Sequence, residues 1–193
     1  MEFVEKEILI TEKESVLELF KTTVNQIKYI SFLSAAYLDL LVSFSGIINA
    51  KTAWDEIYYS RNGFLAIYEA IKTYDNYQKS FRKLIISNYP HLNEEYNELN
   101  LELKKLKKEY YYDNKISILR NKAAGHYDKN YVIYYNQIQS IDVETSKKAI
   151  AGFANFLQSV IIFSDKIIDE LQLSSKINAD KAKAEWELAQ NKK

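Results

Sequence analysis

The sequence lacks several residue types whose absence restricts its fold and chemistry. None of its 193 residues is cysteine, and it contains only four glycines and one proline. The absence of cysteine excludes disulfide frameworks and thiolate metal sites. Glycine and proline are too few for the many tight turns of a β-rich fold, so the composition predicts long helices.

Hydrophobic residues make up 47% of the chain and charged residues 27%, which is typical of a soluble globular protein. The length suffices for one hydrophobic core without disulfide or metal support. We therefore expect a single domain over residues 1–193, with a core at about 11–173 and a C-terminal helical tail at 174–193. Residues 1–6 lack the basic start and apolar run of a signal peptide, which favours a cytoplasmic location.

Basic and acidic residues balance at 26 each, so the net charge is zero. This balance excludes a globally basic coat for nucleic acid, and any site for a polyanion must be local. Residues 102–122 contain such a local excess of positive charge. Its basic residues are Lys104, Lys105, Lys107, Lys108, Lys115, Arg120 and Lys122. The lysine run is either a solvated helix face or an approach for a polyanion, and the sequence leaves both open.

Apolar residues recur at steps of three and four, which predicts an all-α, up-and-down bundle of four to six helices. The first helix should follow a capping box at Thr11–Glu14. Its predicted core positions are Val16, Phe20, Ile27, Ile30, Tyr37, Leu41 and Phe44. The stretch from Lys28 to Lys51 is long enough to span a membrane, but Asp39 in its middle would be costly there. We therefore expect a central core helix and no membrane association.

A second helix is predicted after a turn at Gly46 and Asn49, and an irregular break is predicted at Asp75–Ser80. The predicted core positions of the second helix are Trp54, Ile57, Tyr58, Phe64, Leu65, Tyr68 and Ile71. The whole stripe has helical spacing, so it indicates packing against another element along one side.

Two further helices have regular patterns. The third has the most regular heptad of the chain, with core positions Leu92, Tyr96, Leu99, Leu103, Leu106 and Tyr110. Its pattern breaks at Tyr111–Asn114, where Asp113 or Asn114 is expected to cap the next helix. The last helix is expected from Asp142 to about Leu173. Its core positions are Ile150, Phe153, Leu157, Val160, Ile167 and Leu171.

Arg120 and His126 stand six residues apart in a chain with only three arginines and two histidines. Gly125 is suited to end a helix in left-handed conformation, which would fold the imidazole back towards the guanidinium. A short irregular or extended segment is expected after this motif. Imidazole transfers protons near neutral pH and guanidinium binds phosphate through a rigid set of donors, so the motif predicts a phosphate-handling site.

The sequence has no glycine-rich phosphate loop, nucleotide-binding glycine fingerprint, histidine pair spaced for metal, serine elbow or Glu-x-x-His motif. The other histidine, His91, follows a proline and is expected to be exposed and without a catalytic role. We therefore expect no metal and no cofactor.

The pattern Arg120-Asn121, four residues and then His126, at the end of a helix in a helical bundle, resembles the HEPN superfamily (higher eukaryotes and prokaryotes nucleotide-binding domains). The resemblance is to members linked to abortive infection of phage and to toxin–antitoxin systems. It implies a metal-independent endoribonuclease that acts as a homodimer and leaves a 2′,3′-cyclic phosphate at a site in the dimer interface. It also implies a partner that restrains toxicity, either an antitoxin or a nucleotidyltransferase.

The resemblance implies a role for each motif residue. His126 is the general base or acid, Arg120 holds the scissile phosphate, and Asn121 orients the phosphate or the imidazole. Lys122 and Tyr127 are expected to bind RNA. The alternative is a non-catalytic HEPN-like module that binds a nucleotide or a protein.

Arg61 interrupts the apolar stripe of the second helix, where an unpaired buried charge would be costly. It is predicted either to pair with Asp39 or Glu69, or to bind substrate in the same site as the motif. The sequence does not separate these interpretations.

Overall fold

The structure is a computed structural model that describes residues 25, 27–120, 132, 136 and 139–190. Within these residues the regular secondary structure is entirely helical, with five α-helices, which confirms the predicted all-α fold. The chain divides into two compact units, Met1–Ile161 and Ile162–Lys193. The single domain predicted over the whole chain stays a prediction. Most of the predicted irregular segment after the motif lies outside the described residues.

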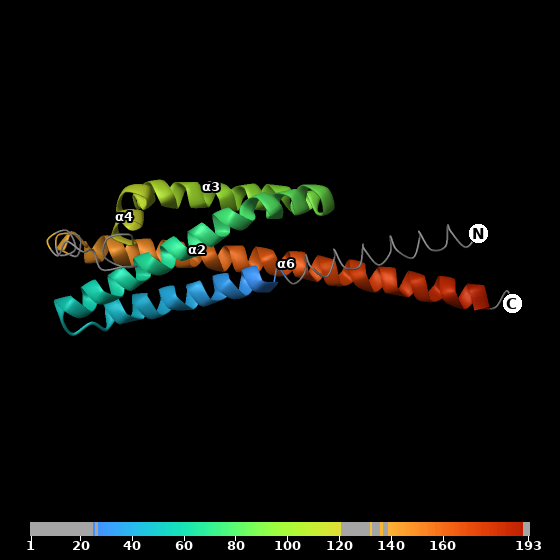
Figure 1. Cartoon of the computed structure of the whole chain (residues 1–193), viewed down its shortest axis with the longest axis horizontal. Helices are drawn as coiled ribbons and strands as arrows, with labels where there is room; N and C mark the ends of the chain where they lie inside the picture. The colour runs from blue at the N-terminus through green and yellow to red at the C-terminus, as the bar shows by residue number, and fades with distance from the viewer. Residues whose placement is uncertain (1–24, 26, 121–131, 133–135, 137–138, 191–193) are drawn as a thin grey trace. The chain divides into compact units, whose positions relative to one another are not determined.

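The first unit is a bundle of long helices (Figure 1). Its members are the Ile27–Ile48 helix, α2 (Ala53–Asn88), α3 (Asn93–Glu109) and the beginning of α6 (Val143–Gln190). Aromatic rings join them: Tyr74 of α2 lies 5.4 Å from Phe156 of α6, and Tyr110 after α3 lies 6.2 Å from Phe153 of α6. The core therefore lies where α2, α3 and α6 meet.

The predicted turn before α2 is confirmed at Asn49 but not at Gly46. Asn49 follows the Ile27–Ile48 helix, and Thr52 and Asp55 form a capping box in which each side chain accepts the other's backbone N–H, at 3.1 and 2.9 Å. Gly46 is helical, and a Cβ there would come within 2.3 Å of the Tyr59 ring. The glycine thus allows two helices to approach closely.

The predicted break at Asp75–Ser80 is wrong, because α2 continues through it for 36 residues. Two side chains of this stretch bind α3: Asp75 Oδ2 accepts from Lys107 Nζ at 2.7 Å, and the Gln78 amide donates to Asn100 Oδ1. The hydroxyl of the preceding residue, Tyr74, donates to the same Asn100 oxygen at 2.9 Å. These contacts with α3 favour a continuous helix where local propensity favours a turn.

The predicted phase of the Ile27–Ile48 helix is also wrong. Ile27 and Leu41, predicted in the core, are 51% and 41% exposed. The buried residues are instead Tyr29, Leu33, Ala36, Leu40, Ser43 and Ile47. The helix is apolar on nearly all sides, so spacing alone could not select the packed side. The predicted start of this helix, including the capping box at Thr11–Glu14, lies outside the described residues.

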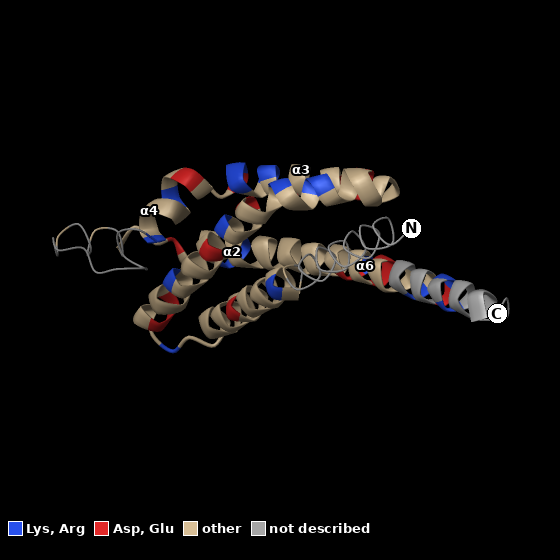
Figure 2. Ribbon diagram, turned by 45° about the vertical axis from the view of Figure 1, so that its right-hand side comes forward, with Lys and Arg blue, Asp and Glu red and all other residues tan. Residues whose placement is uncertain are grey.

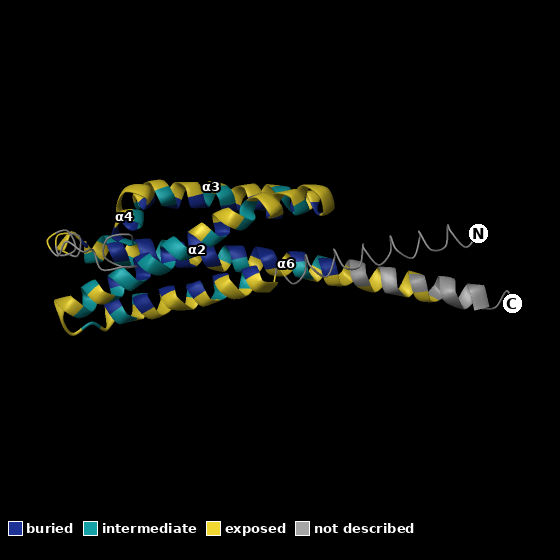
Figure 3. Ribbon diagram, in the orientation of Figure 1, coloured by how far each residue is buried: buried dark blue, intermediate teal, exposed yellow. Residues whose placement is uncertain are grey.

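The Ile27–Ile48 helix is not the central core helix that the sequence predicts. It and Val143–Leu173 are both long and apolar enough to cross a membrane, but only 28% and 50% of their most apolar windows are buried. Figure 3 shows the Ile27–Ile48 helix at an edge of the bundle, with exposed residues along one side. The absence of membrane association stays a prediction.

The predicted boundary after α3 is confirmed, but its capping residue is not. Tyr96, Leu99, Leu103 and Leu106 are buried as predicted, whereas His91 is exposed in the short helix Pro90–Leu92. The chain then turns at Tyr111, whose φ of 51° is the only positive value among the described non-glycine residues. This left-handed residue interrupts the helical backbone and changes its direction.

A π-helical turn, Tyr112–Ile116, follows Tyr111 and leads into the short helix α4, Ser117–Leu119. Asp113 and Asn114 lie inside the π-helical turn, so neither caps α4 as predicted. The left-handed backbone of Tyr111 makes the boundary instead, a conformation that sequence patterns rarely assign to tyrosine.

All six predicted core positions of α6 are buried. The helix begins after Asp142, whose carboxylate accepts the backbone N–H of Thr145 at 3.1 Å. The hydrogen bond from the Thr145 side chain lowers the pKa of this carboxyl group. The predicted end near Leu173 is too early, because the helix continues to Gln190.

Candidate functional site

Only part of the predicted site lies within the described residues. Arg120 directly follows α4, and Arg61 lies on α2. Asn121, Lys122 and His126 lie outside the described residues, as do Gly125 and Tyr127. The geometry of the site is therefore built from Arg120 and the side chains that surround it.

The guanidinium of Arg120 is held by two neighbouring residues of α2. Its Nε and Nη2 donate to Oε1 of Glu69 at 3.0 and 2.7 Å. Its central carbon lies 4.9 Å from the centre of the Tyr68 ring. The ion pair and the cation–π contact together fix the plane and position of the guanidinium.

Apolar packing places Arg120 beside α2. Ile116 and Leu119 precede it and are 1% and 6% exposed, so they anchor the π-helical turn and α4 in the core. The Tyr112 ring is nearly parallel to that of Tyr68, at 10° and 6.2 Å, and its hydroxyl donates to the Tyr68 carbonyl at 3.4 Å. The buried residues Tyr112, Ile116 and Leu119, which all precede Arg120, therefore position the motif arginine beside α2.

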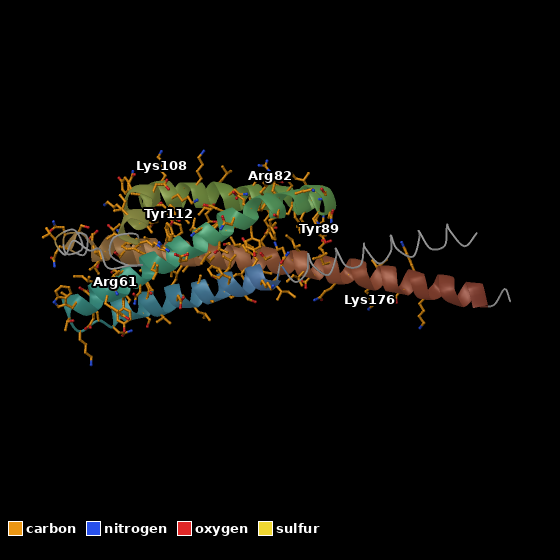
Figure 4. All side chains as sticks on the ribbon, viewed as in Figure 1. Arg61, Arg82, Tyr89, Lys108, Tyr112 and Lys176 are labelled. Carbon is orange, nitrogen blue, oxygen red and sulfur yellow. The ribbon has the colours of Figure 1, made fainter. Side chains whose placement is uncertain are left out.

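A second cation joins the same group of rings. Lys107 of α3 has its Nζ 5.2 Å from the centre of the Tyr112 ring and 2.7 Å from Oδ2 of Asp75. We call Lys107, Tyr112, Tyr68 and Arg120 the cation–tyrosine cluster. Figure 4 labels Tyr112 beyond the C-terminal end of α3, on the side that faces α2. Burial, followed by the nearby Asp75 charge, raises the pKa of the Tyr112 phenol, so it stays neutral at physiological pH.

Arg61 lies eight residues before Glu69 on α2, about 12 Å along the helix axis. Figure 4 labels Arg61 on α2. Its guanidinium carbon is 5.6 Å from the ring centre of Tyr58, on the preceding turn. Glu69, which the sequence offered as a partner for Arg61, binds Arg120. The role of Arg61 in substrate binding stays a prediction.

A polar hollow of about 480 Å³ adjoins the cation–tyrosine cluster. Asp75 and Lys107 line it, together with Lys104, Lys108 and Asn100. Lys104, Lys105 and Lys108 are exposed on α3, opposite its core positions, as the heptad predicts. Figure 2 shows basic residues gathered along this helix. This arrangement fits both interpretations of the lysine run.

A more apolar hollow of about 400 Å³ lies between the beginning of the Ile27–Ile48 helix and α2. Tyr29, Tyr77 and Phe81 line it, and Lys83 is the one charged residue among the described residues that line it. Arg120 is not among these described lining residues. In the described part of the chain, no three His, Asp or Glu side chains lie close enough to hold a metal ion.

Sequence reasoning identified Arg120 but missed the residues that hold it. The apolar pattern places Tyr68 in the core. It suggests Glu69 only as a partner of Arg61 and gives no role to Tyr112. A charged residue next to a predicted core tyrosine was the one available signal for Glu69. It did not identify the partner, because Arg120 is 51 residues away in sequence.

Comparison of the chain with protein-family models, with curated proteins and with solved structures gives no match. The HEPN resemblance therefore depends on the motif and on the helical fold.

Proposed function

We propose that this chain is a HEPN-like, metal-independent endoribonuclease that acts as a homodimer in phage defence or a toxin–antitoxin system. The observation that carries the proposal is the anchored guanidinium of Arg120, the first residue of the arginine–histidine motif. An arginine held by a carboxylate and an aromatic ring is oriented before substrate arrives. The all-α fold, with a helix leading into the motif, also supports it.

The proposed reaction is an attack of the ribose 2′-oxygen on the adjacent phosphorus, with departure of the 5′-oxygen. His126 removes the 2′-hydroxyl proton or protonates the leaving oxygen, and each role typically contributes about 10²- to 10⁴-fold. The second role falls to His126 of the other copy, because one imidazole does not serve as base and acid in the same step. The products are a 2′,3′-cyclic phosphate and a 5′-hydroxyl.

Arg120 binds the scissile phosphate in this scheme and stabilises negative charge on its oxygens. Glu69 orients the guanidinium and also reduces the local positive charge. Asn121, Lys122 and Tyr127 contact the strand close to the reacting phosphate, and Arg61 supplies a further contact. Substrate RNA approaches over the lysines of α3. An antitoxin or nucleotidyltransferase partner would restrain the activity in the cell.

One observation favours a second candidate, a non-catalytic HEPN-like module that binds a nucleotide or another protein. The Arg120 guanidinium already binds Glu69 and Tyr68, which is how a purely structural arginine would join α4 to α2. In that case Arg120 stabilises the fold, and its replacement lowers stability without any change in RNA chemistry.

An RNA cleavage assay separates the two candidates. Purified full-length chain is incubated with single-stranded and structured RNA in excess chelator, beside Arg120→Ala and His126→Ala. We expect cleavage by the unmodified chain and a loss of at least about 100-fold in each variant. Arg82→Ala and His91→Ala are matched controls, because both replaced residues are exposed and lie outside the motif.

The controls should cleave RNA as fast as the unmodified chain. Equal cleavage by all five proteins would indicate a contaminating nuclease and contradict the proposal. No cleavage by any of them, with helical content retained, would favour the non-catalytic module.

A further inference from the structure

The outer side of the Ile27–Ile48 helix is apolar and exposed. Its large apolar residues are between 41% and 64% exposed, and they are Ile27, Phe32, Leu38, Leu41, Val42 and Ile48. We call this side the outer face. An exposed apolar surface of this kind usually marks an interaction site. In Figures 1 and 3 the Ile27–Ile48 helix lies at the edge of the bundle away from α3 and α4, and Figure 3 shows exposed residues along one of its sides.

Two opposite charges lie along one border of the outer face. Lys28 and Asp39 are both exposed, and neither forms an ion pair within the described part of the chain. Eleven residues separate them, which on an ideal helix is about three turns, roughly 16 Å, and a net rotation of about 20°. They therefore share one border but are too far apart to pair with each other.

A second copy of the helix, packed antiparallel about a two-fold axis, satisfies both charges. When Lys28 lies opposite Asp39 of the second copy, the symmetry forms the same ion pair again at the other end. Ser31 then lies within one residue, about 1.5 Å along the axis, of the level of Ala35 of the second copy, and these small residues allow close approach at the centre. Ile27 lies equally near the level of Leu41 along the other border. A parallel arrangement would instead place like charges together.

We propose that the outer face of the Ile27–Ile48 helix binds a second copy of this chain as an antiparallel, two-fold helix pair. Charge complementarity selects this occupant over a lipid bilayer, because burying Asp39 in hydrocarbon is costly. The outer face does not include Arg120, which contacts Tyr68 and Glu69 of α2, so the proposal does not depend on ribonuclease activity. If the motifs of two copies also meet, the two interfaces together produce an assembly larger than a dimer.

Cysteine cross-linking tests this register directly, because the chain contains no cysteine of its own. Full-length Ser31→Cys and Ala35→Cys, carrying different tags, are mixed and mildly oxidised. We expect a disulfide between the two different chains. The matched control pairs Ala35→Cys with Ser45→Cys, which in this register lie about 21 Å apart along the axis and should not cross-link.

Charge reversal tests the orientation through the same cross-link. Lys28→Asp, placed in both cysteine chains, should lower the yield roughly tenfold, because it replaces two attractive pairs with two repulsive ones. The double change Lys28→Asp with Asp39→Lys should restore it. Circular dichroism checks that each variant keeps its helical content.

Three results would overturn the proposal. The first is equal cross-linking in the matched and control pairs. The second is a cross-link yield that Lys28→Asp leaves unchanged. The third is that the chain sediments as a monomer at 100 μM or below and also floats with neutral phospholipid vesicles. The last outcome would assign the outer face to a membrane.

Discussion

Arg120 is the residue on which the proposed chemistry depends, and its neighbours distinguish a catalytic from a structural role. Glu69 binds two of its nitrogens, and Tyr68 lies against its face. In a catalytic site these contacts orient a phosphate-binding group, whereas in a structural site they only join α4 to α2. The two roles differ in what happens when the Glu69 charge is removed.

Glu69→Gln keeps a hydrogen-bond acceptor but removes the negative charge beside Arg120. We expect a lower KM for RNA, because the local charge becomes more positive, and a kcat lower by about tenfold, because the guanidinium is held less firmly. Steady-state cleavage of a fluorogenic RNA in chelator measures both constants. The pair is partly exposed, so the loss of stability should stay below about 1 kcal/mol.

Asp75→Asn is the matched control, because it breaks the other ion pair of the cation–tyrosine cluster, with Lys107. It should change kcat by less than about twofold, since Lys107 does not touch the proposed scissile phosphate. Equal effects of the two variants on kcat and KM would mean that Glu69 acts through the fold alone.

The sequence could identify Arg120 because arginine is rare in this chain and stands at a fixed spacing from a histidine. It could not identify Glu69 as the partner. That pairing depends on how α2 and α4 pack, and the same acid was an equally good partner for Arg61. Residue type thus predicted the chemistry, and only tertiary packing assigned the contacts.

Among the elements, the close contact of three helices at Gly63 has the clearest consequence for stability. A Cβ at Gly63 of α2 would lie 2.3 Å from Ile150 Cδ1 of α6 and 3.4 Å from Ser43 Cβ of the Ile27–Ile48 helix. Ser43 and Ile150 are themselves buried, at 4% and 0% exposed. The absence of a side chain at Gly63 therefore sets how closely these helices approach.

Gly63→Ala should lower the free energy of unfolding by about 1–2 kcal/mol. Overpacking costs about 1–3 kcal/mol. The 2.3 Å approach to Ile150 Cδ1 puts Gly63 in the upper half of that range, and the helix propensity of alanine returns about 1 kcal/mol. Urea denaturation followed by circular dichroism measures the change. Ile150→Val removes the clashing Cδ1. Gly63→Ala should therefore cost less stability in a chain that carries Ile150→Val than in the unmodified chain.

Gly152→Ala serves as the control for glycine replacement in a helix. Its Cβ would lie 3.2 Å from Leu106 Cδ2, the end of a flexible side chain, so its stability should stay within about 1 kcal/mol of the unmodified chain. A Gly63→Ala protein as stable as Gly152→Ala would contradict the close three-helix contact.

The elements differ in how well the sequence predicts them. The core positions of α6 are all predicted correctly, and four of the six predicted for the third helix are buried, while Leu92 and Tyr110 at its two ends are half-buried. Polar residues mark the opposite sides of both helices. The Ile27–Ile48 helix is apolar on nearly all sides, so its spacing did not decide between the packed side and the outer side. The false break at Asp75–Ser80 arose because local propensity does not contain the tertiary contacts that Asp75 and Gln78 make with α3.

At the scale of the whole molecule, buried tyrosines should limit stability at high pH. Burial, the largest cause in each case, raises the pKa of Tyr29, Tyr74, Tyr96 and Tyr112 above the ordinary value of about 10. A group whose pKa is higher in the folded state contributes stability below its unfolded pKa. That contribution is lost as pH rises above about 10, because the unfolded chain then ionises more readily.

Thermal unfolding from pH 8 to pH 11 should therefore show a Tm that falls above about pH 10. Absorbance at 295 nm should resolve two groups among the sixteen tyrosines, one that ionises near pH 10 and one that ionises only as helicity is lost. Ionisation of all tyrosines in one step near pH 10, with helicity retained, would contradict this packing.

Within the first unit, the helical bundle holds the motif arginine against α2 and leaves the outer face of the Ile27–Ile48 helix exposed. The all-α fold could be predicted from composition and spacing. The outer face could not, because the sequence placed that helix at the centre of the core.

The most direct test of the proposed function is the chemistry of the RNA ends. A ribo-dinucleotide and its 2′-deoxy analogue are incubated with the full-length chain in excess chelator, and the products are identified by phosphorus-31 NMR. The proposal predicts a 2′,3′-cyclic phosphate from the ribo-dinucleotide, no reaction of the 2′-deoxy analogue, and no product with His126→Ala. Cleavage of the 2′-deoxy analogue, or an unchanged rate with His126→Ala, would contradict it.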